Sequence, residues 1–149
     1  MSSRIALDTN FVVGLIDEHD LWCASALTLQ AALAAKGFVP VIFDCVMTEA
    51  ISVVARRTHE KRRTANLPAL LERIRTQFPI SSLVWLYPDL PTLYDAVVAL
   101  VEQSSGELNF NDALIALACR DRNIPYLASF DADFDQIAWL KRIARPDQL

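Results

Sequence analysis

Apolar and polar residues alternate along this chain in blocks that predict strands separated by helices. Short apolar runs predict buried strands, and longer stretches with apolar residues at helical spacing predict amphipathic helices. We expect strands at 4–8, 38–46, 83–87, 126–130 and 141–144, and helices at 11–16, 21–36, 49–59, 67–78, 92–103, 112–121 and 134–139. This alternation indicates an α/β fold of three layers, α/β/α, in which helices cover both faces of a central parallel sheet.

Residues typical of helix ends refine several of these boundaries. Gly37 directly follows the expected helix 21–36, where glycine commonly ends a helix. Thr48 is expected to be the N-cap of the helix through Glu49, and Asn111 the N-cap of the helix that begins at Asp112. Asp44 is expected to lie inside a strand, because apolar residues surround it on both sides.

The composition fits a buried sheet better than a membrane protein. The chain has 149 residues, of which 53% are hydrophobic, and its mean hydropathy is +0.25. Its apolar stretches are far shorter than the ~20 residues of a membrane-spanning helix, and the first residues do not resemble a signal peptide. We therefore expect one domain, 1–149, in the cytoplasm. The excess of apolar residues favours an oligomer.

The cysteines and histidines do not predict a zinc site or a disulfide framework. The three cysteines, Cys23, Cys45 and Cys119, are widely spaced and form no C-x-x-C pair, and the two histidines, His19 and His59, add no ligand cluster. Buried thiols in a reducing compartment are the simpler interpretation.

The charge distribution is acidic overall but contains one basic segment. The net charge of −4 and the isoelectric point near 5.1 argue against a broad surface for nucleic acid. Five cations nevertheless fall within 56–63, opposed only by Glu60: Arg56, Arg57, Lys61, Arg62 and Arg63. They are either a solvated helix end or a rim that contacts phosphates, and the sequence alone favours the first.

Four acidic residues stand where apolar blocks end or helices begin. Asp8 closes the first expected strand and Asp131 the fourth, while Glu49 and Asp112 lie near the starts of expected helices. In an open parallel sheet, strand ends and the helix starts that follow them meet along one edge. Carboxylates gathered there repel one another unless a cation or protons neutralise them. The pattern therefore suggests a metal site.

Each of these acids also has an ordinary explanation, as a helix cap, a first-turn residue or part of a solvated turn. The metal interpretation depends on their convergence. Oxygen ligands without a nearby histidine or cysteine suit Mg²⁺ or Mn²⁺ better than zinc. No Ser-His or Cys-His nucleophile and no glycine-rich phosphate loop is recognisable, and glycine occurs only three times. Nucleoside triphosphate and dinucleotide chemistry is therefore poorly supported.

Four short motifs together resemble a PIN domain, most closely the VapC-type toxin ribonucleases of bacterial toxin–antitoxin pairs. They are L-D-T-N at 7–10, T-E-A at 48–50, N-D-A-L-I-A at 111–116 and A-S-F-D-A-D-F at 128–134. The resemblance spans nearly the whole chain and keeps all four acidic positions in order. The first motif is weak alone, whereas the last two, with their separation, are fairly specific.

The resemblance implies a role for each matching residue. Asp8, Glu49, Asp112 and Asp131 would form the catalytic acidic quartet that holds Mg²⁺ or Mn²⁺. The sequence leaves open whether Glu49 reaches the ion directly or through a water molecule. Three further residues would have auxiliary roles: Asn10, Ser129 and Asp133. The family also implies a sheet of order 3-2-1-4-5, a homodimer, an RNA substrate and an inhibitory antitoxin partner. The expected activity is metal-dependent endoribonuclease activity.

Three other functions are alternatives to an endoribonuclease. The chain could be a non-catalytic binding module that keeps the PIN fold, or a metal-dependent nuclease that acts on DNA. A phosphotransfer domain also places an aspartate at a strand end, but Asp8 is not followed by a second aspartate two positions later. Three tryptophans, Trp22, Trp85 and Trp139, are scattered, which fits core or dimer contacts better than an aromatic platform for RNA.

Overall fold

Five parallel strands form the centre of the computed structural model, which describes residues 2–149. The strands are β1 (Arg4–Leu7), β2 (Val39–Phe43), β3 (Leu83–Val84), β4 (Tyr126–Ala128) and β5 (Lys141–Ile143). Their order is β3-β2-β1-β4-β5, and every pairing is parallel. The expected α/β/α fold class and strand order are confirmed.

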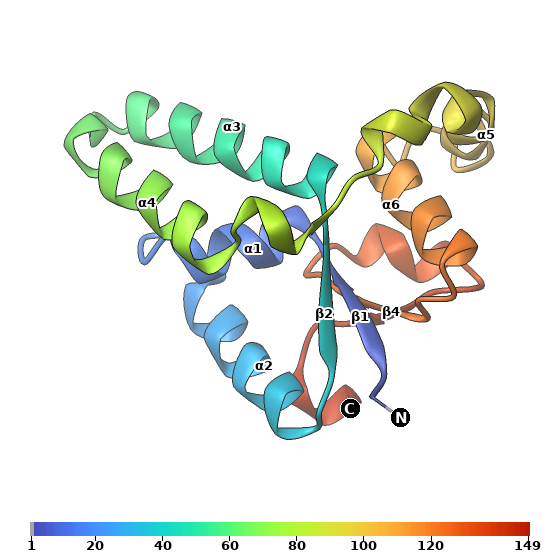
Figure 1. Ribbon diagram of the computed structural model, residues 1–149, viewed down its shortest axis with the longest axis horizontal. Helices are drawn as coiled ribbons and strands as arrows, with labels where there is room; N and C mark the ends of the chain where they lie inside the picture. The colour runs from blue at the N-terminus through green and yellow to red at the C-terminus, as the bar shows by residue number, and fades with distance from the viewer. Residues whose placement is uncertain (1) are drawn as a thin grey trace.

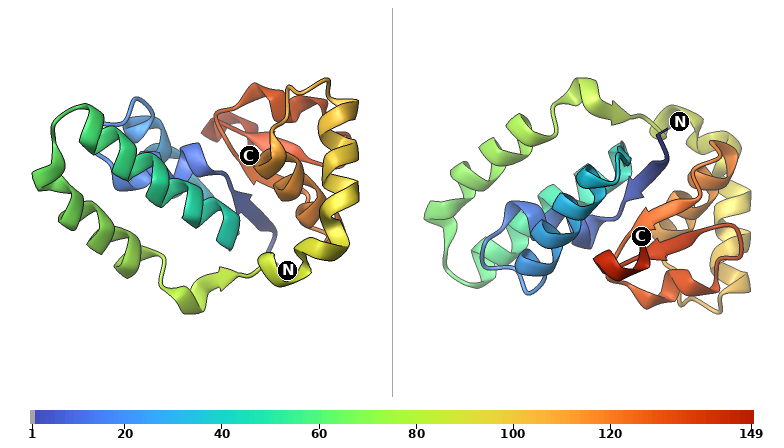
Figure 2. Two further views of the ribbon diagram at one scale, coloured as in Figure 1. Left: turned by 90° about the horizontal axis from the view of Figure 1, so that it is seen from above. Right: turned by 90° about the horizontal axis from the view of Figure 1, so that it is seen from below.

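Helices cover both faces of the sheet (Figures 1 and 2). On one face lie α1 (Thr9–Ile16), α2 (Cys23–Ala35), α3 (Asp44–Glu60) and α4 (Leu67–Gln77). On the other lie α5 (Leu90–Gln103) and α6 (Phe110–Asp121). Short 3-10 segments occur at Thr64–Asn66, Ile80–Ser82, Tyr87–Asp89, Ala132–Gln136 and Pro146–Gln148. Long crossovers are required here because parallel strands cannot be joined by tight turns.

The core lies between the sheet and these two helical layers. In β1 the side chains of Ile5, Ala6 and Leu7 are all buried, as expected for a strand covered on both faces. Residues 113–119 of α6 are also buried throughout. Each fully buried large apolar side chain contributes roughly 1.5–3 kcal/mol. The acidic residues at the ends of these elements are therefore held on well-packed supports.

Helices α1 and α2 approach each other closely at a glycine. A Cβ atom added at Gly14 would lie 2.9 Å from the Cβ atom of Ala26, closer than such atoms normally approach. A larger residue at either position would push the two helices apart, at a cost of about 1–3 kcal/mol for an overpacked core. This contact fixes the loop between α1 and α2, which lies beside the site described below.

Helix α3 begins earlier than the sequence pattern predicts. Strand β2 ends at Phe43, and Asp44 opens the helix. The buried carboxylate of Asp44 accepts hydrogen bonds from the backbone N–H groups of Cys45 (2.9 Å) and Tyr87 (2.9 Å). The predictions of a strand through Asp44 and of an N-cap at Thr48 are therefore wrong. The boundary between β2 and α3 could not be recognised from the sequence pattern, because the residues on both sides of Asp44 are apolar.

Helix α6 is capped by a residue other than the expected one. Asn109 is the N-cap, and its side chain accepts a hydrogen bond from the N–H of Asp112 at 2.9 Å. Asp112 returns the contact by accepting from the N–H of Asn109, which completes a capping box. The prediction that Asn111 caps this helix is therefore wrong. The expected helix at 134–139 is instead the 3-10 segment Ala132–Gln136.

The cysteines are free thiols, and two of the three are buried. Cys45 and Cys119 are buried, Cys23 is partly exposed, and all three are free. Burial raises the pKa of both buried thiols to about 12, so they are unreactive packing residues. Within residues 2–149, no helix combines the length and apolar character needed to cross a membrane.

Candidate metal centre

Two of the four acidic residues come from the carboxyl ends of neighbouring strands. Strands β1 and β4 pair so that Leu7 lies opposite Ala128. The residue after Leu7 is Asp8, whose N–H donates to the carbonyl oxygen of Ala128 at 3.0 Å. Asp131 follows β4 by three positions. The expectation that the first and fourth strands bring these two acids to one edge of the sheet is confirmed.

The other two acids come from helices on opposite faces of the sheet. Glu49 lies in the second turn of α3, and Asp112 lies in the first turn of α6. All four carboxylates line one cleft of about 220 Å³. The remaining lining residues are Thr9, Asn10, Val13, Asp20, Trp22, Val53, Arg57 and Asn109. Residues separated by more than 120 positions in the sequence thus meet in one acidic cleft.

Asp8 is the most buried of the four, with 5% of its surface exposed. Its Oδ1 accepts the N–H of Thr9 at 2.8 Å, and its Oδ2 accepts the hydroxyl of Ser129 at 2.5 Å. The pKa of Asp8 is raised to about 7, chiefly by burial. The charges of Asp112 and Asp131 also raise this pKa, while the hydrogen bonds from Ser129 and Thr9 lower it. Asp8 is therefore a carboxyl group that gains a proton near neutral pH when no cation is bound.

Asp112 shows the same effect more weakly. Burial raises its pKa to about 6, opposed by the hydrogen bond from the N–H of Asn109. The negative charges of Asp131, Glu49 and Asp133 also raise it. Burial, and to a smaller extent the neighbouring negative charges, disfavours the ionised forms of Asp8 and Asp112, and a bound cation would offset both effects.

Hydrogen bonds hold Glu49 in place. Its Oε2 accepts from the hydroxyl of Thr9 at 3.1 Å and from the side-chain amide of Asn111 at 3.2 Å. These donors come from α1 and α6, while Glu49 belongs to α3. Three helices from two layers therefore fix one carboxylate at the cleft.

Ser129 and Asn10 link the two strand ends. The Ser129 hydroxyl oxygen accepts the N–H of Asp131 at 3.0 Å while its proton goes to Asp8. The side-chain oxygen of Asn10 accepts the N–H of Phe130 at 3.2 Å. Asp133 is exposed, does not line the cleft, and contacts Asp131 only through its backbone N–H at 2.9 Å. Ser129 and Asn10 thus occupy supporting positions, whereas Asp133 lies at the periphery.

Sequence reasoning missed several residues that shape the cleft. Thr9 and Asn111 donate to Glu49, and Asn109 caps α6 while it lines the cleft. The signal for Asn109 was available, because an asparagine three positions before an acidic residue matches a capping box. In the sequence Arg57 is one of five cations in a basic segment, and nothing local predicts that it reaches the cleft.

The donor set suits a hydrated divalent cation. Among residues 2–149, no group of three or more His, Cys, Asp or Glu side chains forms a ready-made metal site. Mg²⁺, however, keeps several water ligands and is usually held by one or two carboxylates together with substrate phosphates. The oxygen donors and the like-charge repulsion at Asp8 and Asp112 fit this open form of coordination.

Comparison with protein families supports the same assignment. The PIN domain family model matches residues 5–140. The chain belongs to the PIN domain family. PIN domains are generally metal-dependent nucleases that act on nucleic acid, and they generally use divalent metal ions. No curated protein and no solved structure matched the chain.

Proposed function

We propose that this PIN domain is a Mg²⁺- or Mn²⁺-dependent endoribonuclease that hydrolyses phosphodiester bonds in RNA. The observation that carries the proposal is the meeting of Asp8, Glu49, Asp112 and Asp131 in one cleft. The raised pKa values of Asp8 and Asp112 add to it, because burial and, to a smaller extent, the neighbouring carboxylates disfavour their ionised forms, which a divalent cation would stabilise.

The four carboxylates have different roles in this proposal. Asp8 and Asp112 are the strongest candidates to ligate the cation directly, and Asp131 comes next. Glu49 already accepts two hydrogen bonds on Oε2, so we assign it to the cation through a water molecule. Ser129 and Asn10 are positioning residues, since they hold the two strand ends together. Asp133 contributes negative charge at the margin.

Hydrolysis forms a bond from a water oxygen to phosphorus and breaks a phosphorus–oxygen bond to the sugar. The attacking water gives up one proton, and the departing sugar oxygen takes up one. A divalent ion in the cleft would lower the pKa of that water and neutralise charge on the phosphodiester. A carboxylate in the cleft would accept a hydrogen bond from the attacking water and orient it. The Thr9 hydroxyl and the Asn111 side-chain amide, which both donate to Glu49, would hold the Glu49 carboxylate in place.

We further propose that the protein is the toxin of a toxin–antitoxin pair, of VapC type, and is inhibited by an antitoxin. This finer assignment is supported by the motifs at 7–10, 48–50, 111–116 and 128–134. A small protein encoded in the adjacent reading frame, with a DNA-binding part and an amphipathic tail, would support it. The absence of such a partner would argue for a PIN nuclease outside this group.

A homodimer is also part of the proposal. An apolar groove of about 470 Å³ lies between α3, α4 and the segment 78–85, which includes β3. Ile80 and Trp85 line it with 72% and 46% of their surfaces exposed, and Ile51 is exposed beside them. Exposed apolar residues gathered on one face favour burial against another protein surface. We assign this groove to a second copy of the chain.

The decisive experiment is RNA cleavage by purified protein and two matched variants. Asp112→Asn removes a candidate ligand, and Asp121→Asn makes the same change at the far end of α6, where the exposed Asp121 pairs with the adjacent Arg120. Replacing a residue that hydrogen-bonds to a metal ligand reduces metal affinity or activity about 10–100-fold, so loss of a direct ligand is expected to reduce cleavage more than ~100-fold. Undiminished cleavage by folded Asp112→Asn would refute the mechanism.

The same assay separates the alternatives. A single-stranded DNA of equal sequence tests the alternative that the substrate is DNA. Equal cutting of both would show that the site does not select RNA through the 2′-OH. A folded protein that cuts neither substrate and binds no Mn²⁺ would instead be the non-catalytic module.

A further inference from the structure

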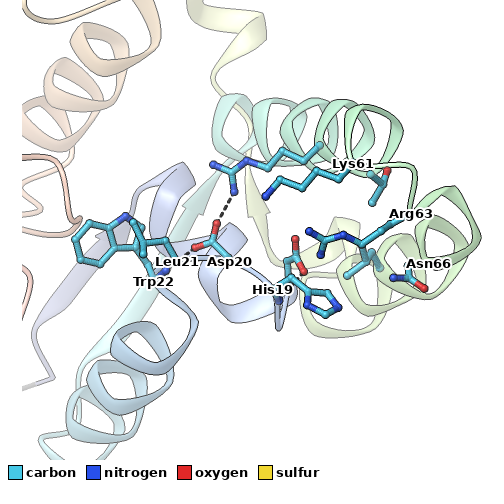
Figure 3. Close-up of a pocket in the computed structure, with 11 residues that line it drawn as sticks. His19, Asp20, Leu21, Trp22, Lys61, Arg63 and Asn66 are labelled. Atoms are coloured by element: carbon cyan, nitrogen blue, oxygen red, sulfur yellow. Dashed lines mark hydrogen bonds and ion pairs between the residues drawn. The ribbon is translucent and has the colours of Figure 1, made fainter.

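A second cleft adjoins the acidic cleft and is lined by cations. It measures about 260 Å³. The loop 17–22 forms one side, and the end of α3 with the segment after it forms the other (Figure 3). Arg57, Lys61 and Arg63 line this second side. We refer to it as the cationic cleft.

The cationic cleft divides the basic segment 56–63 into two sets. Arg57, Lys61 and Arg63 line it, whereas Arg56 and Arg62 do not. Arg57 and Lys61 are four positions apart, which places them on one side of α3 and its end. The basic segment is therefore not a uniformly solvated helix end, because three of its five cations face a common hollow.

The carboxylates of the cationic cleft are already engaged, while two of its cations are free. The side chain of Asp20 is almost fully buried and forms an ion pair with Arg57. Asp17 is buried, and its Oδ1 accepts the N–H of His19 at 3.0 Å. Within residues 2–149, Lys61 and Arg63 form no ion pair. In Figure 3 their side chains extend toward the loop that carries His19 and Asp20. They remain available to an anion.

The two clefts share a wall. Asp20, Trp22 and Arg57 line both of them. The ion pair between Asp20 and Arg57 stands at this wall and fixes the arginine there. One face of the Trp22 ring stacks on Phe130, with ring centres 4.6 Å apart, and 39% of the residue is exposed. A single-stranded nucleic acid that leaves the acidic cleft on this side would therefore meet the Trp22 ring first and then the cations of the cationic cleft.

We infer that the cationic cleft is a phosphate-binding subsite for the RNA nucleotides that flank the cleaved bond. Lys61 and Arg63 contact backbone phosphates, Arg57 contacts the phosphate at the shared wall, and Trp22 offers a surface on which a base stacks. The inference rests on the proposed function, because it extends the same substrate beyond the acidic cleft. It also explains how a protein of net charge −4 can hold an anionic polymer.

The test compares two double variants that remove equal charge from the same segment. Lys61→Gln with Arg63→Gln removes the two unpaired cations of the cleft. Arg56→Gln with Arg62→Gln, the control, removes two cations that do not line it. Circular dichroism checks that both fold. A fluorescein-labelled single-stranded RNA is titrated in EDTA, so that no cleavage is needed, and anisotropy is followed over a range of salt concentrations.

The expected result is weaker binding by the cleft variant and a smaller salt dependence. Each phosphate contact contributes about −0.7 to the slope of log K against log salt for single strands, so losing two should reduce it by about 1.4. The control variant should keep the wild-type slope. Any of three results would overturn the inference. The wild type and the cleft variant have equal slopes, both double variants lose RNA affinity equally, or the wild type binds no RNA.

Substrate length gives a second readout. A dinucleotide reaches only the acidic cleft, so wild type and cleft variant should cut it equally. A longer RNA should show a raised KM in the cleft variant with little change in kcat.

If the wild type binds RNA with the predicted slope but cuts none in Mg²⁺ or Mn²⁺, the proposed function fails and the binding subsite stands. If the cleft variant retains normal binding but captures less of an acidic peptide, a protein partner uses the cleft instead.

Discussion

Replacing Asp8 with asparagine should make the metal-free protein more stable at alkaline pH. The carboxyl group is buried, and burial together with the charges of Asp112 and Asp131 raises its pKa from 3.8 to about 7. Above that pH the folded protein must carry a buried negative charge with no cation beside it. Asparagine has nearly the same shape but no charge, so it removes this cost.

The magnitude follows from the pKa shift. A rise from 3.8 to about 7 corresponds to about 4 kcal/mol at 1.36 kcal/mol per unit. This is an upper value, because Asp8 and Asp112 share part of their repulsion. The asparagine also weakens the contact with the Ser129 hydroxyl, which costs about 1 kcal/mol. We expect a net gain of about 2–3 kcal/mol in the free energy of unfolding at about pH 8.

The sign of the pH dependence is fixed by the direction of the shift. Between pH 3.8 and about 7 the folded protein holds the Asp8 proton more tightly than the unfolded chain does. The protonated carboxyl group therefore adds stability below pH 3.8, and that stability is lost as the pH rises toward 7. The free energy of unfolding of Asp8→Asn should not show this decrease with rising pH. Near pH 4 the variant should be slightly less stable than the wild type.

The assay is urea unfolding in EDTA, followed by tryptophan fluorescence at several pH values between 4 and 8. Asp95→Asn, at an exposed carboxylate on α5, is the control and should not alter the pH dependence. Adding Mg²⁺ at pH 8 should stabilise the wild type by mass action and leave Asp8→Asn unchanged. A variant less stable than the wild type at pH 8, or a difference independent of pH, would refute the reasoning.

Two further predictions concern the support of the cleft and the apolar groove. Ser129→Ala removes a hydrogen bond that lowers the pKa of Asp8, so Mn²⁺ binding measured by calorimetry should need a higher pH than in the wild type. An unchanged pH dependence would contradict this. Trp85→Glu places a charge in the exposed apolar groove and should convert a dimer to a monomer in light scattering at similar folded stability. A wild-type monomer, or a variant that stays dimeric, would exclude this interface.

The sequence predicted the carboxyl edge of the sheet better than the helix starts. Asp8 and Asp131 could be placed together because apolar runs mark strands and parallel strands end at one edge. The start of α3 at Asp44 could not be found, since the strand and the first turn of the helix are both apolar there. Asn111 was mistaken for a cap because two asparagines stand two positions apart, and only the backbone geometry distinguishes them.

The cationic cleft shows a second limit of the sequence pattern. The cluster of cations at 56–63 was visible, but which of them face a common hollow depends on the phase of α3 and on where it ends. The ion pair between Arg57 and Asp20 joins residues 37 positions apart. Such long-range pairs depend on the packing of α1 and α3, which no local motif encodes.

Calorimetric titration of Mn²⁺ into wild-type protein and Asp112→Asn tests the central claim most directly. The claim is that Asp8, Glu49, Asp112 and Asp131 in the acidic cleft capture a hard divalent cation. We predict saturable binding by the wild type that weakens as the pH falls from 8 to 6, because Asp8 and Asp112 take up protons in this range. Binding should be lost in Asp112→Asn. No bound Mn²⁺ in the wild type, or equal binding by both proteins, would contradict the account.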